Sequence, residues 1–178
     1  GQQRTAPPRE PRLLEQSRTA TGALRTVIEL PAVADSYIAS ARPEQNFGAD
    51  SLFIGYNVFG DNFGAQRLLM RFDIAGTLPA NAVINRAQLR LRLAFASPSS
   101  DAPMGTVLRR LASGWSEAGV TWNSQPEWTD VDDRTSVGSA LDWYEWNIGP
   151  EVQAWVNGTP NDGVEIIGDE TVQERERA

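Results

Sequence analysis

The sequence predicts an all-β protein: an antiparallel β-sandwich or jelly roll with one short helix and an extended N-terminal arm. Three observations lead to this fold class. Apolar and polar residues alternate in many short segments, turn-forming residues separate those segments, and only one segment has helical spacing. The chain has 178 residues, of which 40% are hydrophobic, so it is large enough to form one domain with a buried core. Its apolar runs are too short for a membrane-spanning helix, so no membrane span is predicted.

Residues 1–22 are predicted to form a basic arm that is distinct from the rest of the chain. Three prolines lie among four arginines, and Leu13 and Leu14 are its only sizeable apolar residues. This composition favours an extended segment that cannot bury enough apolar surface to fold alone. Counting Arg against Asp and Glu, residues 1–34 have a net charge of +2 and residues 35–178 have a net charge of −9. The arm is therefore basic and the body acidic.

Residues 23–178 are predicted to form the sandwich domain. In 67–74 and in 87–95, apolar side chains occupy every second position and Arg, Asp or Gln occupy most of the others. This alternation predicts strands with one face in the core and one in solvent. Weaker patterns predict further strands at 24–30, 35–40, 51–57, 106–112, 143–148 and 163–167.

The predicted helix spans residues 150–157. Pro150 suits the first position of a helix, Val152 and Trp155 fall on one face, and Gly158 can end it. The Asn157-Gly158 pair is interpreted as a turn rather than as a glycosylation site. We expect this helix to close one end of the sandwich.

The amino-acid alphabet excludes most catalytic chemistry. The chain has no Cys, His or Lys, so all sixteen basic residues are Arg. Thiol nucleophiles, His-ligated zinc, imidazole bases and Schiff-base lysines are therefore absent. The net charge of −7 argues against general nucleic-acid binding, which depends on neutralising phosphates. The sequence predicts a non-enzymatic protein without a required cofactor.

Several short motifs occur in order over residues 35–167: DSYI at 35–38, NFG at 46–48, RFD at 71–73, AQLRL at 87–91, WSE at 115–117, VTWN at 120–123, VQAW at 152–155 and NDGV at 161–164. Together they resemble a DNRLRE-type domain. The resemblance implies a β-sandwich that is secreted by bacteria or archaea and is extracellular or on the cell surface. It also implies kinship with carbohydrate-binding modules, some of which recognise acidic polysaccharides.

The C-terminal segment departs from this family pattern. Such domains usually end with one more strand whose second half is aromatic, whereas residues 172–178 contain one sizeable apolar side chain and no aromatic ring. The sequence therefore predicts a final strand that is cut short or replaced, with unpaired backbone groups beside the core. Relatives that bind acidic sugars use basic residues including Lys, so no ligand residue is transferred to this chain.

The favoured functional prediction is a structural subunit of a self-assembling cell-surface fibre or matrix, in which copies of the chain join through the arm. A strand donated by one copy would complete the sheet of the next and produce a filament unless the contact closes a ring. The predicted donor residues are Leu13, Leu14, Leu24, Thr26, Ile28 and Leu30.

The alternative prediction is a polysaccharide-binding domain of a larger secreted protein. In 143–148, Trp143 lies on one face of a strand and Tyr144 and Trp146 on the other, so one set is exposed unless the loop 124–142 covers it. An exposed aromatic ring can stack on a sugar or anchor an interface. Trp128 is a further candidate.

Other motifs carry weaker predictions. Asp130, Asp132 and Asp133 could bind Ca²⁺ through carboxylate oxygens, although a solvated acidic loop explains them as well. Trp115 and Trp122 are expected to fill the core or cover its rim, with sugar stacking as the alternative.

Overall fold

The computed structural model describes residues 10–100 and 102–178, without the side chains of residues 130–132. It confirms the all-β sandwich with one short helix. The elements are β1 (Arg12–Arg18), β2 (Leu24–Glu29), β3 (Ala34–Ala39), β4 (Ile54–Asn57), β5 (Gly64–Arg71), β6 (Gln88–Arg92), β7 (Ala96–Ser97), β8 (Met104–Leu111), β9 (Trp128–Val137), β10 (Trp143–Asn147), α1 (Gly149–Val156), β11 (Val164–Ile167) and β12 (Arg175–Arg177).

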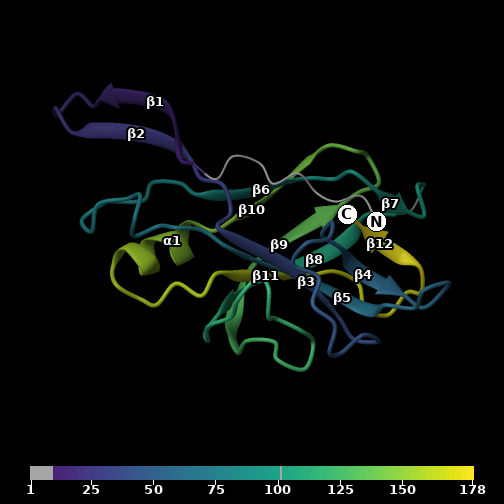
Figure 1. Ribbon diagram of the computed structural model, residues 1–178. Helices are drawn as coiled ribbons and strands as arrows, with labels where there is room; N and C mark the ends of the chain where they lie inside the picture. Colours follow the sequence, from purple (N-terminus) through teal and green to yellow (C-terminus); the bar gives the residue numbers. More distant parts are fainter. Residues whose placement is uncertain (1–9, 101) are drawn as a thin grey trace.

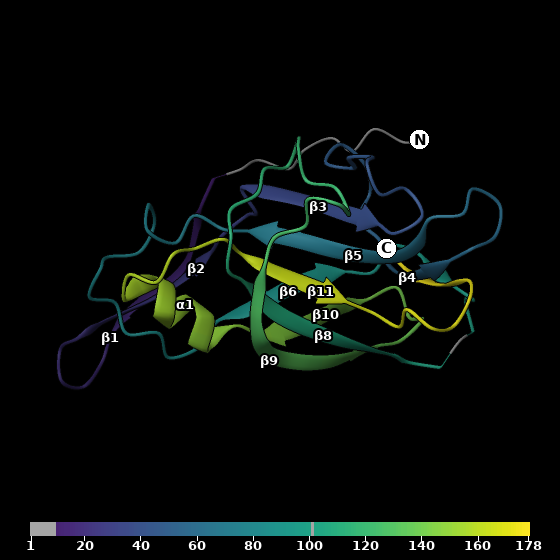
Figure 2. The same ribbon diagram turned by 90° about the horizontal axis from the view of Figure 1, so that it is seen from below.

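The sandwich consists of two layers of antiparallel strands. In the first layer β3, β5, β11, β8 and β9 lie side by side in that order (Figure 2). One end of β5 also pairs with β4, which continues into β12 and β7. The second layer is the pair β6 and β10, which lies across the core from the first.

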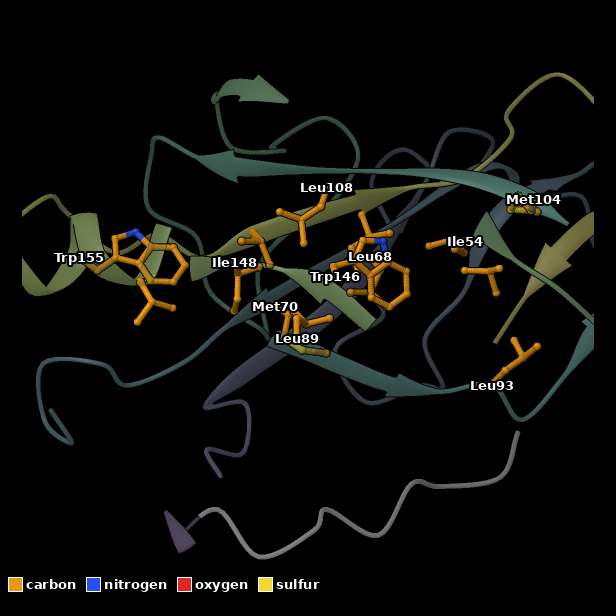
Figure 3. Close-up of a cluster of buried hydrophobic side chains, with 14 of the residues drawn as sticks. Ile54, Leu68, Met70, Leu89, Leu93, Met104, Leu108, Trp146, Ile148 and Trp155 are labelled. Atoms are coloured by element: carbon orange, nitrogen blue, oxygen red, sulfur yellow. The ribbon is translucent and has the colours of Figure 1, made fainter. Parts of the chain in front are cut away.

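The main core fills the space between these layers. Leu68 of β5 and Leu108 of β8 belong to the same buried cluster as Leu89 of β6 and Trp146 of β10, and Trp155 of α1 closes one end (Figure 3). The indole N–H of Trp146 donates to the Thr106 hydroxyl at 2.9 Å, so the one polar atom of this ring is satisfied. Fully burying a large apolar side chain stabilises the fold by about 1.5–3 kcal/mol, so this cluster is the main source of stability.

Strand β9 forms where the sequence predicted the loop 124–142. Its sequence WTDVDDRTSV lacks the alternation that marks a half-buried strand. It is nevertheless paired with β8, from Met104 opposite Val137 to Leu111 opposite Trp128, with two irregularities in register. Pairing with β8, rather than an alternation of apolar residues in its own sequence, makes this segment a strand.

Strand β12 corrects the expectation of a vacant final strand position. It lies between β4 and β7, and beyond it the Ala178 N–H donates to the Phe95 carbonyl at 3.0 Å. Arg177 is 2% exposed, and its guanidinium donates to the carbonyls of Gly138 at 2.8 Å, Glu176 at 2.9 Å and Ser97 at 3.2 Å. Charged side chains can therefore occupy this buried position because hydrogen bonds replace apolar packing.

Two further residues of this region are buried or constrained. Asn57 of β4 donates to the Glu176 carboxylate at 2.7 Å, while burial raises the pKa of Glu176 against the effect of its hydrogen bonds. Gly55 has a φ of +121°, and a Cβ added to it would lie 1.9 Å from the Arg175 carbonyl oxygen. Only glycine allows β4 and β12 to approach this closely.

The turn before β12 is held by Asp169. Its carboxylate accepts from the Thr171 hydroxyl at 2.7 Å, from the Thr171 N–H at 2.9 Å and from the Arg175 guanidinium at 3.0 Å. These bonds, those from Thr171 first, lower the pKa of Asp169 to about 2. The ionised carboxylate thus fixes the direction in which the chain enters β12.

The described part of the N-terminal segment contains a β-hairpin. Residues 12–29 form a hairpin of β1 and β2 that is a separate two-stranded sheet and projects away from the sandwich (Figure 1). The predicted boundary after residue 22 falls in the turn between these strands, and the part of the arm at 1–9 lies outside the described residues. Among the predicted donor residues, Leu13, Leu14 and Leu24 are exposed by 59%, 53% and 58%, Thr26 is also exposed, and Ile28 and Leu30 are half-buried.

Candidate functional site

The predicted aromatic residues separate into two exposed and two inward-facing side chains. Trp143 is 53% exposed and Trp128 is 51% exposed, whereas Trp146 is 2% exposed. Tyr144 is half-buried beside the core, and its hydroxyl donates to the Ala140 carbonyl at 3.0 Å. The structure thus decides the question that the alternation in 143–148 left open: Trp143 is on the outer face of β10.

The register of β6 and β10 assembles a polar face around Trp143. Arg92 lies directly opposite Trp143, Arg90 opposite Glu145, and Gln88 opposite Asn147. Directly opposed residues in an antiparallel pair point to the same side of the sheet. Because Leu89 of β6 points into the core, these alternate residues must point outward.

Arginines surround the exposed indole. The Arg90 guanidinium carbon lies 5.1 Å from the centroid of the Trp143 ring, and Arg90 Nε lies 2.7 Å from a Glu145 carboxylate oxygen. The Arg90 side chain is exposed and the Glu145 side chain is partly exposed, so this ion pair contributes little stability. Arg92 is exposed and has no ion pair or side-chain hydrogen bond among the described residues, which leaves its five N–H donors available. This face is basic although the protein as a whole is acidic.

The combination of groups on this face suits a polar polymer with apolar patches. An indole offers a flat apolar surface, and a guanidinium donates two parallel hydrogen bonds to a carboxylate or to neighbouring oxygens. Gln88 also accepts from the Arg86 guanidinium at 2.6 Å, which adds a third arginine at the edge of the face. We refer to Gln88, Arg90, Arg92, Trp143 and Glu145 as the Trp143 face.

The other exposed tryptophan has a different environment. Trp128 lies on the outer face of the first layer, where the Arg109 guanidinium carbon is 4.0 Å from its ring centroid. Arg109 is 7% exposed and forms an ion pair with Glu165, which is 1% exposed, at 2.5 Å. Burial raises the pKa of Glu165, and the charge of Arg109 opposes that rise. Trp128 therefore covers a buried ion pair, and the cation beneath it is already neutralised.

Trp115 and Trp122 have structural contacts, in line with the expectation that they cover the rim of the core. Both pack against a small buried cluster that includes Leu69 and Val120, on the outer side of the first layer. The Arg67 guanidinium carbon lies 4.6 Å from the Trp122 ring centroid. Trp115 donates from its indole N–H to the Asp162 carbonyl at 2.8 Å.

The acidic cluster predicted to bind Ca²⁺ lies on β9 rather than in a loop. Asp133 accepts a hydrogen bond from the Asn147 N–H at 2.7 Å, which links β9 to β10. The side chains of Asp130 and Asp132 are not described. Among the described residues no group of three acidic side chains is arranged to bind a metal ion. The calcium site stays a prediction.

Sequence reasoning missed a hollow of about 440 Å³ at the end of the sandwich near β3 and β4. Tyr37 and Phe47, which stack with ring centroids 4.3 Å apart, line it together with Arg42 and Asp50. Burial, followed by the charge of Asp50, raises the pKa of Tyr37, so its hydroxyl stays protonated. The two stacked rings are only 3% and 2% exposed and cannot present a face to a sugar.

Residues 26–176 match the profile of carbohydrate-binding module family 96. The chain belongs to this family. The matched region includes β3 to β11 and both layers of the sandwich, with the Trp143 face inside it. No curated protein matches the chain. The expectation of a carbohydrate-binding-module-like domain is confirmed, while the DNRLRE name itself stays a resemblance.

Membership of family 96 agrees with a non-catalytic role, since a carbohydrate-binding module binds its polymer without cleaving it. Within the described part of the chain, the only helix has eight residues, and it is too short and too polar to cross a membrane.

Proposed function

We propose that this protein is a non-catalytic polysaccharide-binding module of a secreted protein and that its ligand lies on the Trp143 face. The observation that carries the proposal is the position of Trp143: it is half-exposed on the outer face of β10, directly opposite Arg92, which forms no ion pair with any residue that the structure describes. Family 96 membership supports polysaccharide as the ligand class and an extracellular location.

The chemistry of the face favours an acidic polysaccharide. Trp143 stacks on the apolar side of a sugar ring, Arg92 donates to a carboxylate, and Arg90 holds the indole in place. Glu145 already pairs with Arg90, so it does not repel an anionic chain as strongly as a free carboxylate would. The resemblance to modules for acidic polysaccharides points to the same ligand class.

The test is affinity electrophoresis in gels that contain alginate or pectin. Replacement of a central stacking residue costs about 1–2 kcal/mol or more, so Trp143→Ala should weaken binding about tenfold or more. Trp143→Phe should restore part of it. Phe59→Ala is the matched control, because Phe59 is also half-exposed but lies in the turn after β4 and is not part of the Trp143 face. Retention of full affinity by Trp143→Ala, with loss in Trp128→Ala, would move the site to the other sheet.

The fibre-subunit prediction has no support in the fold or the family match. It depended on a vacant strand position in the sandwich, and β12 occupies that position. A neutral polysaccharide as ligand would contradict the role given to Arg92, so dextran and laminarin gels are the appropriate comparison. Binding to these with equal strength would leave the module assignment intact and refute the charge argument.

A further inference from the structure

The N-terminal hairpin is amphipathic. The register of β1 and β2 places Leu13 opposite Ile28 and Arg18 opposite Leu24 on one face. On the other face Arg12 forms an ion pair with Glu29 at 2.7 Å. The residues of both strands are exposed apart from Ile28, which is half-buried, and Leu13 and Leu24 are 59% and 58% exposed. A two-stranded hairpin is at best marginally stable alone, so this apolar face needs a partner.

The outer edge of β2 is free to pair. At the turn, the Thr19 N–H donates to the Ala23 carbonyl, so Ala23 directs its backbone groups towards β1. Successive residues of a strand direct their N–H and C=O groups to opposite sides, so Leu24, Thr26 and Ile28 direct theirs away from β1. Within the described part of the chain these three residues form no backbone hydrogen bond on that side, and β2 pairs with β1 alone.

We propose that two copies of this chain associate through antiparallel pairing of their β2 strands, with the two-fold axis at Val27. In this register Arg25 lies opposite the partner subunit's Glu29, and the partner subunit's Arg25 lies opposite Glu29. Thr26 and the partner subunit's Ile28 then exchange backbone hydrogen bonds, because both direct these groups outward. The outer edge of β2 therefore pairs with the same edge of the second copy, and this contact provides two ion pairs and hydrogen-bond partners for the outward backbone groups of β2.

Charge complementarity selects this register over its neighbours. An axis at Thr26 would place Arg25 opposite the partner subunit's Val27 and leave Glu29 without a cross-strand charge. Pairing of the two β1 strands about Glu15 would place like charges opposite each other, Glu15 on itself and Arg12 on Arg18. Like charges directly opposite each other destabilise a sheet. The β2 pairing also joins the exposed leucines of both hairpins into one apolar face of a four-stranded sheet.

Disulfide trapping tests the position of the axis. Val27 forms a non-hydrogen-bonded pair with its symmetry mate, for which the Cα separation is about 4.5 Å, and this lies within disulfide reach. The chain has no cysteine of its own, so Val27→Cys introduces a single thiol. We expect rapid formation of a covalent dimer in air. The matched control is Ser17→Cys, on the same face of the hairpin but one strand further from the axis. Equal cross-linking rates for the two variants would overturn the proposed register.

Sedimentation velocity over a range of concentrations tests the association itself. The wild type should form dimers, and Arg25→Glu should weaken them about tenfold or more, since two attractive pairs become repulsive. The charge-swapped variant Arg12→Glu/Arg25→Glu/Glu29→Arg restores every pair and should restore the dimer. A wild type that stays monomeric up to millimolar concentration would refute the proposal. Trp143→Ala should dimerise normally, so a failure here is distinct from a failure of the proposed binding face.

Discussion

Arg177 tests whether β12 is an integral part of the sandwich. Its buried guanidinium donates to four carbonyl groups at 2.8, 2.9, 3.2 and 3.3 Å. A hydrogen bond from a charged donor contributes about 1.5–3 kcal/mol net, so the two short bonds alone account for about 3–6 kcal/mol. Removing a buried charge also removes its desolvation cost, which offsets part of this sum. We therefore expect Arg177→Met to lower the free energy of unfolding by about 3 kcal/mol.

Urea denaturation followed by tryptophan fluorescence measures this change. For a chain of this size, the same loss lowers Tm by about 6–12 °C. Arg92→Met is the matched control, because Arg92 is exposed and its replacement should alter stability by less than about 0.5 kcal/mol. Equal stability of the two variants would show that the hydrogen bonds of Arg177 do not hold β12 in the sheet.

Three other predictions concern the same region. Asp169 has a pKa of about 2 in the folded protein, below its ordinary value, so the ionised carboxylate stabilises the fold at neutral pH. This stabilisation is lost as the pH falls from about 4 towards 2. Asp169→Asn should therefore make the stability less dependent on pH in that window of an acid unfolding curve. Glu176 has a raised pKa, so the charged form is costly, and Glu176→Gln should leave stability at pH 7 unchanged or raise it by up to about 1 kcal/mol in urea titrations. Gly55→Ala should destabilise by more than about 3 kcal/mol and lower the Tm in calorimetry, because its Cβ would collide with the Arg175 carbonyl; an unchanged Tm would contradict the close approach of β4 and β12.

The fold could be predicted where burial follows the chemical character of the side chain. Leu68, Met70 and Leu89 lie in segments with an apolar side chain at every second position, and their strands formed close to the expected positions. Strands β9 and β12 could not be found this way, because their sequences are rich in charge. Sequence patterns treat Asp, Glu and Arg as solvent-facing, yet Glu165 and Arg177 are 1% and 2% exposed. Their burial depends on hydrogen-bond partners that are distant in the sequence.

The candidate site, like the fold, could be predicted from the sequence only in part. Alternation in β10 predicted that either Trp143 or the pair Tyr144 and Trp146 would face outward, but it could not decide which. The decision came from packing: Trp146 is enclosed by the core and donates to Thr106 on another strand. The proximity of Arg92 to Trp143 depends on the register between two strands that lie about fifty residues apart in the chain. No local motif encodes that register.

The position of β12 between β4 and β7 has a consequence for synthesis. Asn57 of β4 and Glu176 of β12, which bond to each other, are 119 residues apart. During translation the edges of β4 and β7 are made early and then wait with open backbone groups until β12 leaves the ribosome. Such long-range pairing is intrinsically slow, and nascent chains with unpaired strand edges adhere to one another. The sandwich is therefore most vulnerable to aggregation in the interval after β4 and β7 have emerged and before β12, the strand that closes it, has been made.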